Sequence, residues 1–276
     1  MRKLSELSLD EVEKVKQRIL ELRNEGFSYS RIVEAIREEF EVTISKPTVI
    51  RWCKGITDPA NKIKRVNLEP SQSLAYIIGV YFGGGSLDAD EKYRYRIKLK
   101  VIDKEFAEAF SNALKDIGAN PRLYFESSTG RWCVEATSKE LYMFLSKPKE
   151  ELFKIGEMFP REFIRGFFDS EGCFCFDKKA NAGFLAMSNY DLDILEFIRG
   201  LLLTKFGIKG SINLTKRKGT SVNIKGKRYF YSSDLYELRI SGIKDITEFY
   251  AKINITINRK RVLVEKYLKT KGYYQT

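Results

Sequence analysis

The stretch that decides the fold of this chain is Phe163-Ile164-Arg165-Gly166-Phe167-Phe168-Asp169-Ser170-Glu171-Gly172. Its pattern occurs once before, as Tyr76-Ile77-Ile78-Gly79-Val80-Tyr81-Phe82-Gly83-Gly84-Gly85. Both copies have a glycine at the fourth and at the tenth position, with large apolar residues between. They disagree at two positions, where Phe82 corresponds to Asp169 and Gly84 corresponds to Glu171. One duplication of this length predicts two halves related by an internal 2-fold axis, not a solenoid.

Each copy is predicted to form an apolar helix with a glycine among large side chains. Such a glycine costs a helix about 1 kcal/mol relative to alanine, unless another backbone must approach closely. We therefore expect the two helices to pack against each other through Gly79 and Gly166. Glu171 then lies at the end of the helix pair, where the chain turns into a strand. A carboxylate at that place is a candidate ligand for a divalent metal ion.

In these features the chain resembles the LAGLIDADG homing endonucleases in their single-chain form, from roughly Leu74 to the C-terminus. The resemblance implies an α+β fold, in which two pseudo-symmetric αββαββα repeats meet at the motif helices and form a DNA-binding saddle. It also implies metal-dependent cleavage of DNA with Mg²⁺, or another divalent ion such as Mn²⁺ or Ca²⁺. Glu171 is then one catalytic metal ligand, and Gly84 occupies the position of the missing second acid. The neighbouring metal-site positions are Gly83 and Ser170.

The resemblance adds Asn189 to the catalytic site, because it corresponds to a polar position near the metal in the family, whereas its counterpart in the first repeat is Val101. With one acid left, we expect DNA binding with cleavage abolished or reduced to slow nicking. Asp88 and Asp90 follow Gly84 closely, but in a strand or loop beyond the helix end. A natural loss that leaves a DNA-binding regulator or an RNA maturase, and a deliberate change that traps uncut DNA, both explain Gly84. Whether the gene lies in an intron, in an intein or alone is equally open.

Composition favours a polyanionic partner. The 276 residues include 49 Lys and Arg against 37 Asp and Glu, which gives a net charge of +12, and such a balance favours nucleic acid over a solvated basic surface without a partner. No apolar run approaches the ~20 residues of a membrane span and no signal peptide is apparent, so we expect an intracellular, cytoplasmic protein. Histidine is absent and the four cysteines form no CxxC pair, which argues against zinc. Cys173 and Cys175 are expected to be buried thiols, and abundant Lys, Glu and Ile suggest a thermophile.

Residues 1–58 are predicted to be a separate all-α domain of three short helices. Ser28 and Ser45 are suited to cap the second and third helices, and Pro47 fits the first turn of the third. The apolar spacing resembles a helix-turn-helix domain, whose third helix enters the major groove; a plain three-helix bundle is the alternative. The candidate DNA contacts are Lys46, Thr48, Arg51 and Lys54. Residues 59–72 are predicted to be a basic linker.

The repeats are predicted to occupy residues 73–158 and 159–276. The first contains the clearest strand, residues 92–100, whose one face carries Arg94, Arg96, Lys98 and Lys100. Four like charges side by side are better placed along phosphates than in bare solvent, which predicts DNA contact. The second repeat offers a row of hydrogen-bonding side chains and a long basic loop, with Ser211, Asn213, Thr215, Arg217 and Arg228 as candidate DNA-binding residues. Because one chain contains both halves, we expect a monomer bound to double-stranded DNA.

Overall fold

The computed structural model describes residues 1–57, 66–90, 94–177, 179–224 and 226–273. The N-terminal unit consists of β1 (Arg2–Lys3), the short 3-10 helix η1 (Leu4–Glu6), α1 (Leu9–Asn24), α2 (Tyr29–Phe40), β2 (Val42–Thr43) and α3 (Lys46–Cys53). The first repeat follows with α4 (Gln72–Gly83), β3 (Ser86–Ala89), β4 (Tyr95–Val101), α5 (Lys104–Asp116), β5 (Arg122–Glu126), β6 (Arg131–Thr137), α6 (Lys139–Leu145) and α7 (Lys149–Met158). The second comprises α8 (Pro160–Glu171), β7 (Gly172–Asp177), β8 (Ala182–Asn189), α9 (Leu192–Phe206), β9 (Ser211–Lys216), β10 (Ser221–Ile224), β11 (Lys227–Phe230), β12 (Leu235–Ile240), α10 (Ile243–Lys252) and α11 (Asn258–Thr270).

The N-terminal unit forms the predicted three helices around a core of its own. The Ser28 and Ser45 side chains accept hydrogen bonds from the backbone N–H groups of Arg31 and Thr48, as N-cap residues do. The fully or nearly fully buried side chains in this core include those of Val15, Ile19, Ile32, Ile36, Val49 and Trp52. The predicted boundary at residue 58 lies outside the described residues, as do positions 59–65 of the predicted linker. Val66, in the rest of that linker, is buried in the core of the repeats.

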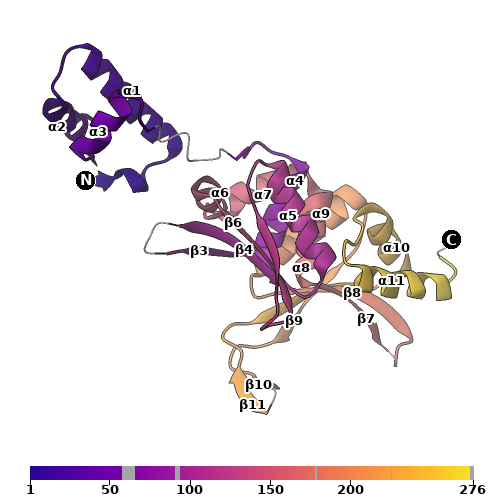
Figure 1. Cartoon of the computed structure of the whole chain (residues 1–276). Coiled ribbons are helices and arrows are strands. Elements are labelled where there is room, and N and C mark those ends of the chain that lie inside the picture. The colour runs from indigo at the N-terminus through magenta and orange to yellow at the C-terminus, as the bar shows by residue number, and fades with distance from the viewer. Residues whose placement is uncertain (58–65, 91–93, 178, 225, 274–276) are drawn as a thin grey trace.

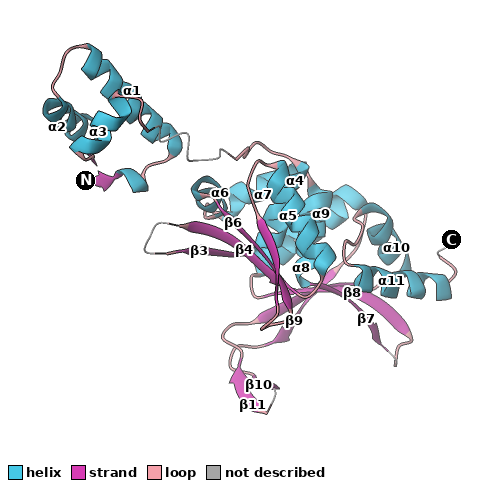
Figure 2. Ribbon diagram, in the orientation of Figure 1, coloured by secondary structure: helices cyan, strands magenta, loops and turns pink. Residues whose placement is uncertain are grey.

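Two four-stranded antiparallel sheets of the same design carry the repeats (Figures 1 and 2). Their strand orders are β3-β4-β6-β5 and β7-β8-β12-β9, so each strand of the first sheet has an equivalent in the second. One face of each sheet packs against the helices through alternate residues such as Ile97 and Leu99 of β4 and Leu185 and Met187 of β8. The other face carries the intervening, more exposed residues. The two-repeat α+β fold predicted from the sequence is thus confirmed.

The motif helices α4 and α8 are in contact through their glycines. A Cβ atom added to Gly166 would lie 2.3 Å from the carbonyl oxygen of Tyr76, and one added to Gly79 would lie 2.1 Å from that of Phe163. These two contacts are equivalents across the pseudo-2-fold axis, since the paired residues hold the same positions in the two motif copies. Only glycine allows the two backbones to approach this closely.

Two pairs of charged residues also link the repeats, again by symmetry. Arg259 of α11 forms a two-pronged ion pair with Asp103, the residue at the N-cap position of α5, with N–O distances of 2.6 and 2.8 Å. Lys149 at the start of α7 binds Asp191, the N-cap residue of α9, at 2.9 Å. Each repeat therefore binds, through one cation, the N-terminal end of a helix in the other repeat: α5 in the first and α9 in the second.

Local differences from the predicted elements have clear causes. Residues 227–240 form two strands, β11 and β12, because the chain bends at Ser232 and Ser233 between them. Cys173 is exposed and Cys175 is only partly buried, so the expectation of buried thiols is wrong. On β7 it is Phe174 that faces the helices, against Tyr267, which turns both cysteines to the other side of the sheet. Among the described residues, no helix is both long and apolar enough to cross a membrane.

The glycine contacts give a direct test of the helix pair. We expect Gly166→Ala to destabilise the protein by about 1–3 kcal/mol or more, which is the usual cost of overpacking. The Tyr76 carbonyl that the new methyl group would meet belongs to a helix and cannot move aside. Gly200→Ala is the matched control: Gly200 also lies within a helix, and nothing stands within 4 Å of an added Cβ. That substitution should be neutral or stabilise by up to about 1 kcal/mol. Urea unfolding of the wild type, Gly166→Ala and Gly200→Ala measures these differences in stability. Equal unfolding midpoints for the two variants would contradict the close packing at Gly166.

Candidate nucleic-acid interface

The C-terminal turns of the two motif helices lie side by side, with Gly83 against Ser170. The Ser170 hydroxyl is 3.4 Å from the carbonyl oxygen of Val80, to which it donates, and a Cβ on Gly83 would lie 2.3 Å from the Cβ of Ser170. There is thus no room for a side chain at position 83. Gly83 and Ser170 immediately precede Gly84 and Glu171, and their part in a metal site stays a prediction.

Glu171 is half-buried at the end of α8. Burial raises the pKa of its carboxyl, and the positive charge of Lys260 opposes that shift. Lys260 itself is buried, and its Nζ donates to the carbonyl oxygens of Phe168 at 3.1 Å and Asp169 at 2.7 Å. The Phe168 carbonyl also accepts the N–H of Gly172, whereas the Asp169 carbonyl lies in the last turn, where carbonyls lack partners within the helix. This lysine therefore supplies a hydrogen-bond donor to the C-terminal turn of α8. Burial lowers the pKa of Lys260 to about 8.

Gly84, the equivalent of Glu171, is exposed and unobstructed. Its φ of −108° is open to any L-residue. An added Cβ would meet only the Ser170 side chain, at 3.8 and 3.9 Å, which is ordinary contact. Glycine is therefore not required at this position by packing or by backbone conformation, in contrast to Gly79 and Gly83.

The surrounding acids do not complete a site for a pair of divalent metal ions. Asp169 is buried and accepts hydrogen bonds from the Tyr76 hydroxyl at 2.8 Å and the Thr256 N–H at 3.2 Å. Asp88 is engaged by cations on β4. In the part of the chain that the structure describes, no three Asp, Glu or Cys side chains are grouped as metal ligands. Glu171 alone does not fit a two-metal cleavage site.

Asn189 uses both ends of its side-chain amide within the protein. Its Nδ2 donates to the carbonyl oxygen of Phe82 at 3.1 Å, and its Oδ1 accepts from the N–H of Asp191 at 2.8 Å. It therefore joins the end of α4 to the start of α9, close to Gly83 and Gly84. These bonds give Asn189 a structural role, and a part in catalysis stays a prediction.

The predicted cationic row on β4 is present, but acids lie among its members. Arg94, which precedes the strand, binds Asp90 at 2.6 Å, and Lys98 binds Asp88 at 2.8 Å. Arg96 also binds Asp88, at 2.6 Å, and Lys100 pairs with Glu126 of β5. The repulsion expected among the four cations is thus relieved inside the protein. Ion pairs at the surface contribute about 0–1 kcal/mol each, so an incoming phosphate can replace such a carboxylate.

The candidates in the second repeat lie on β9 and beyond it. Ser211, Asn213 and Thr215 are exposed on one face of β9, and the Thr215 hydroxyl donates to the carbonyl oxygen of Leu235 at 2.9 Å. Arg217 follows the strand, and Arg228 lies on β11 of a hairpin that projects from the sheet (Figure 1).

In the N-terminal unit, Lys46, Arg51 and Lys54 are exposed on and just after α3. Thr48 is partly buried and its hydroxyl is 2.8 Å from that of Ser45, so part of its hydrogen-bonding capacity serves the helix cap.

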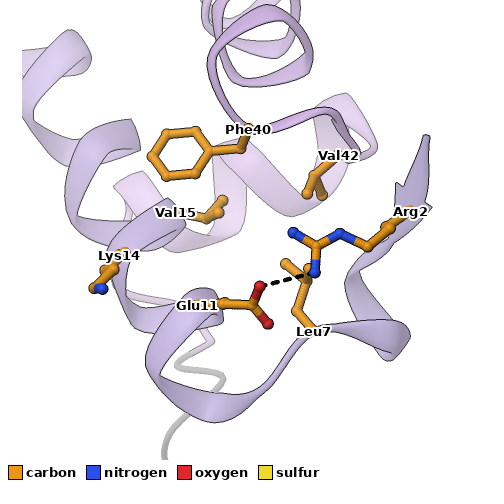
Figure 3. Close-up of a pocket in the computed structure, with 7 residues that line it drawn as sticks. All are labelled: Arg2, Leu7, Glu11, Lys14, Val15, Phe40 and Val42. Atoms are coloured by element: carbon orange, nitrogen blue, oxygen red, sulfur yellow. Dashed lines mark hydrogen bonds and ion pairs between the residues drawn. The ribbon is translucent and has the colours of Figure 1, made fainter.

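Two further hollows lie in the described part of the chain. The larger, of about 1050 Å³, lies between the N-terminal unit and the first repeat, and residues of both line it, among them Leu7, Tyr95 and Lys139. A cavity of about 50 Å³ lies between α1, α2 and the N-terminal strand, beside the ion pair of Arg2 and Glu11 at 2.8 Å (Figure 3). A water molecule occupies about 30 Å³ in the liquid, so this space suits water and not a substrate.

Lys139 of α6 reaches the N-terminal unit, where its Nζ donates to the carbonyl oxygens of Leu7 at 2.8 Å and of Ser5.

Similarity to known proteins agrees with this architecture. Residues 71–147 and 158–254 match the family described as the LAGLIDADG-like domain. An uncharacterized protein of Methanocaldococcus jannaschii is 44% identical over 275 residues, which cover 97% of each chain. Among solved structures, I-DmoI in complex with DNA and Ca has a TM-score of 0.49 at 17% identity, covering 70% of this chain and 96% of that one. Full-length WhiA from Thermotoga maritima has a TM-score of 0.47 at 19% identity, covering 74% and 62%. The matched residues include both motif helices and both sheets, and the chain belongs to the LAGLIDADG-like domain family.

Proposed function

We propose that this protein is a sequence-specific double-stranded DNA-binding protein built on an endonuclease scaffold, which cuts neither strand or only nicks slowly. The observation that carries the proposal is the pair of equivalent positions at the ends of α4 and α8. One holds the half-buried carboxylate of Glu171, and the other is Gly84, an exposed glycine that packing does not require. The binding frame is thus complete, while half of the acidic pair is missing.

Charge and shape support DNA as the ligand. The net charge of +12 draws the chain to polyanions, and the faces of the two sheets that are turned away from the helices carry the cations of β4 and the polar row of β9. The capped helices of the N-terminal unit add a candidate reader of the major groove. Both repeats lie in one chain, so the proposed DNA-binding form is a monomer, and the proposed location is intracellular.

The chemistry explains why one acid is insufficient. A divalent ion in a nuclease polarises the scissile phosphate and lowers the pKa of an attacking water. Here Glu171 is the only motif carboxylate available to hold such an ion, and Asp88 and Asp169 are engaged elsewhere. The protein therefore keeps the positive field that holds phosphate but has lost half of the negative charge that gathers metal. A non-catalytic DNA-binding regulator follows from the same observation.

Salt dependence tests the DNA-binding face. Replacing Arg94, Arg96, Lys98 and Lys100 together by alanine should weaken binding to every duplex. The slope of log K against the logarithm of the salt concentration should become shallower by about one for each lost phosphate contact. Asp88→Asn is the opposite control: it frees Arg96 and Lys98 from their shared carboxylate and should strengthen binding. An unchanged slope in the fourfold variant would remove β4 from the interface. Titration with an RNA duplex of the same sequence tests the RNA maturase alternative.

The charge state of Glu171 has a measurable effect on stability. Because its folded pKa is raised, stability is lost as pH rises from the ordinary value of 4.5 through the higher folded pKa. Glu171→Gln should therefore raise the melting temperature at neutral pH and change it little below pH 4.5. Glu157→Gln, on an exposed face of α7, controls for the loss of one negative charge. An equal effect of Glu171→Gln at both pH values would contradict the buried, charged carboxylate.

The sharpest test restores the missing acid. Gly84→Asp should give Mg²⁺-dependent double-strand cleavage in a substrate library, because position 84 accepts a side chain without strain. Gly84→Asn has the same shape without the charge and should stay inactive, and Glu171→Gln added to Gly84→Asp should abolish cutting again. Two nearby carboxylates repel without metal, so Mg²⁺ should raise the melting temperature of Gly84→Asp more than that of the wild type. If Gly84→Asp binds DNA and still fails to cut, the chain is no longer an endonuclease scaffold, whatever its ancestry, and the regulator function applies.

A further inference from the structure

The second repeat has an arm that the first repeat lacks. Between β5 and β6 the first repeat makes a short turn at residues 127–130, whereas between β9 and β12 the second inserts the hairpin β10–β11. The hairpin is anchored at its base, where the N–H of Gly219 donates to the carbonyl oxygen of Tyr231 at 2.9 Å and the N–H of Tyr231 to that of Thr220 at 3.0 Å. It extends away from the helices and past the end of the sheet (Figures 1 and 2). None of its strand residues belongs to the hydrophobic core.

The two faces of this ribbon differ in chemistry. Directly paired residues of an antiparallel ribbon share a face, and alternate residues return to it. Val222, Ile224, Lys227 and Tyr229 therefore share one face, on which the Val222–Tyr229 pair stabilises the ribbon. The opposite face carries Ser221 across from Phe230, and Asn223 across from Arg228. All four of these side chains are exposed.

Two neighbours on the same face of the hairpin, Ser221 and Phe230, hold the side chain of Arg228 in place. Its Nη2 donates to the Ser221 hydroxyl at 3.3 Å, and its guanidinium carbon is 5.5 Å from the centre of the Phe230 ring. Among the described residues, Arg228 forms no salt bridge with a carboxylate, in contrast to the paired cations of β4. An arginine with its orientation partly fixed loses less rotamer freedom when it binds a ligand. Phe230 is 63% exposed, so the ring supports the guanidinium without burying it.

This arrangement has the chemistry of base readout. A two-stranded ribbon fits the major groove, which is about 12 Å wide, and there arginine binds guanine O6 and N7 while asparagine binds adenine N6 and N7. Building on the proposed DNA binding, we infer that the β10–β11 hairpin enters the major groove beyond the second repeat, where Arg228 reads a guanine and Asn223 an adjacent base. Phe230 is a positioning residue for Arg228. The footprint on DNA is consequently asymmetric, with base-specific contacts extended at the second-repeat end only.

A modified base separates readout from phosphate contact. A duplex selected by the wild-type chain from a random library is resynthesised with 7-deazaguanine at one guanine at a time, which removes N7 and keeps base pairing. We expect one position at the second-repeat end to lower wild-type affinity roughly tenfold. Arg228→Lys, which keeps the charge but not the two-pronged geometry, should lose this sensitivity, and Phe230→Ala should reduce it without changing the salt slope.

Lys227→Ala is the matched control, because Lys227 lies on the other face of the same ribbon. It should weaken binding across all sequences and lower the salt slope by about one, with the 7-deazaguanine pattern intact. If Arg228→Lys selects the same sequences as the wild type, or if no guanine at that end is sensitive, the hairpin is not a base reader. If the wild-type chain binds no duplex at low salt, the proposed function itself fails and this inference falls with it.

Discussion

The backbone contact between α4 and α8 is the constraint on which the repeats depend. At Gly79 and Gly166, each helix lies so close to a carbonyl of the other that a single methyl group would overlap it. This distance fixes the separation of the two helix ends and, through the strands that follow directly from them, the relative position of the two sheets. The surface that the two sheets form together therefore has a geometry set mainly at two residues without side chains.

On this symmetric frame the two helix ends are satisfied by different groups. The end of α8 receives a buried lysine, Lys260, from α11, whereas the end of α4 receives the amide of Asn189 from β8. The cationic end belongs to the motif copy that keeps its acid, so Glu171 lies near a positive charge that partly offsets its burial. The neutral end belongs to the copy with Gly84. The absence of an acid at position 84 therefore leaves no buried cation without compensation, which is one physical reason why glycine there is compatible with the fold.

The sequence predicted what depends on periodicity and on local chain chemistry. Duplicated glycines, the serine caps of α2 and α3, and the alternation along β4 are visible within a few residues, and the structure has all of them. Contacts between distant elements were not predictable in this way. Lys260 stands in the run Arg259-Lys260-Arg261, which resembles a solvated helix face, yet its side chain is buried because α11 packs beneath the end of α8. Likewise Asp88 neutralises β4 only because β3 folds back beside it.

The crossed ion pairs between the repeats have a meaning for the origin of the chain. The first repeat supplies the acceptor Asp103 and the donor Lys149, and the second supplies the acceptor Asp191 and the donor Arg259. Each half thus carries both members of a complementary set, as the self-complementary interface of a 2-fold dimer requires. Two identical copies of one half would satisfy the same pairs. The bridges are what duplication and fusion of a homodimeric half would leave behind, and within one chain the two halves are free to differ, as they do at Gly84 and Glu171.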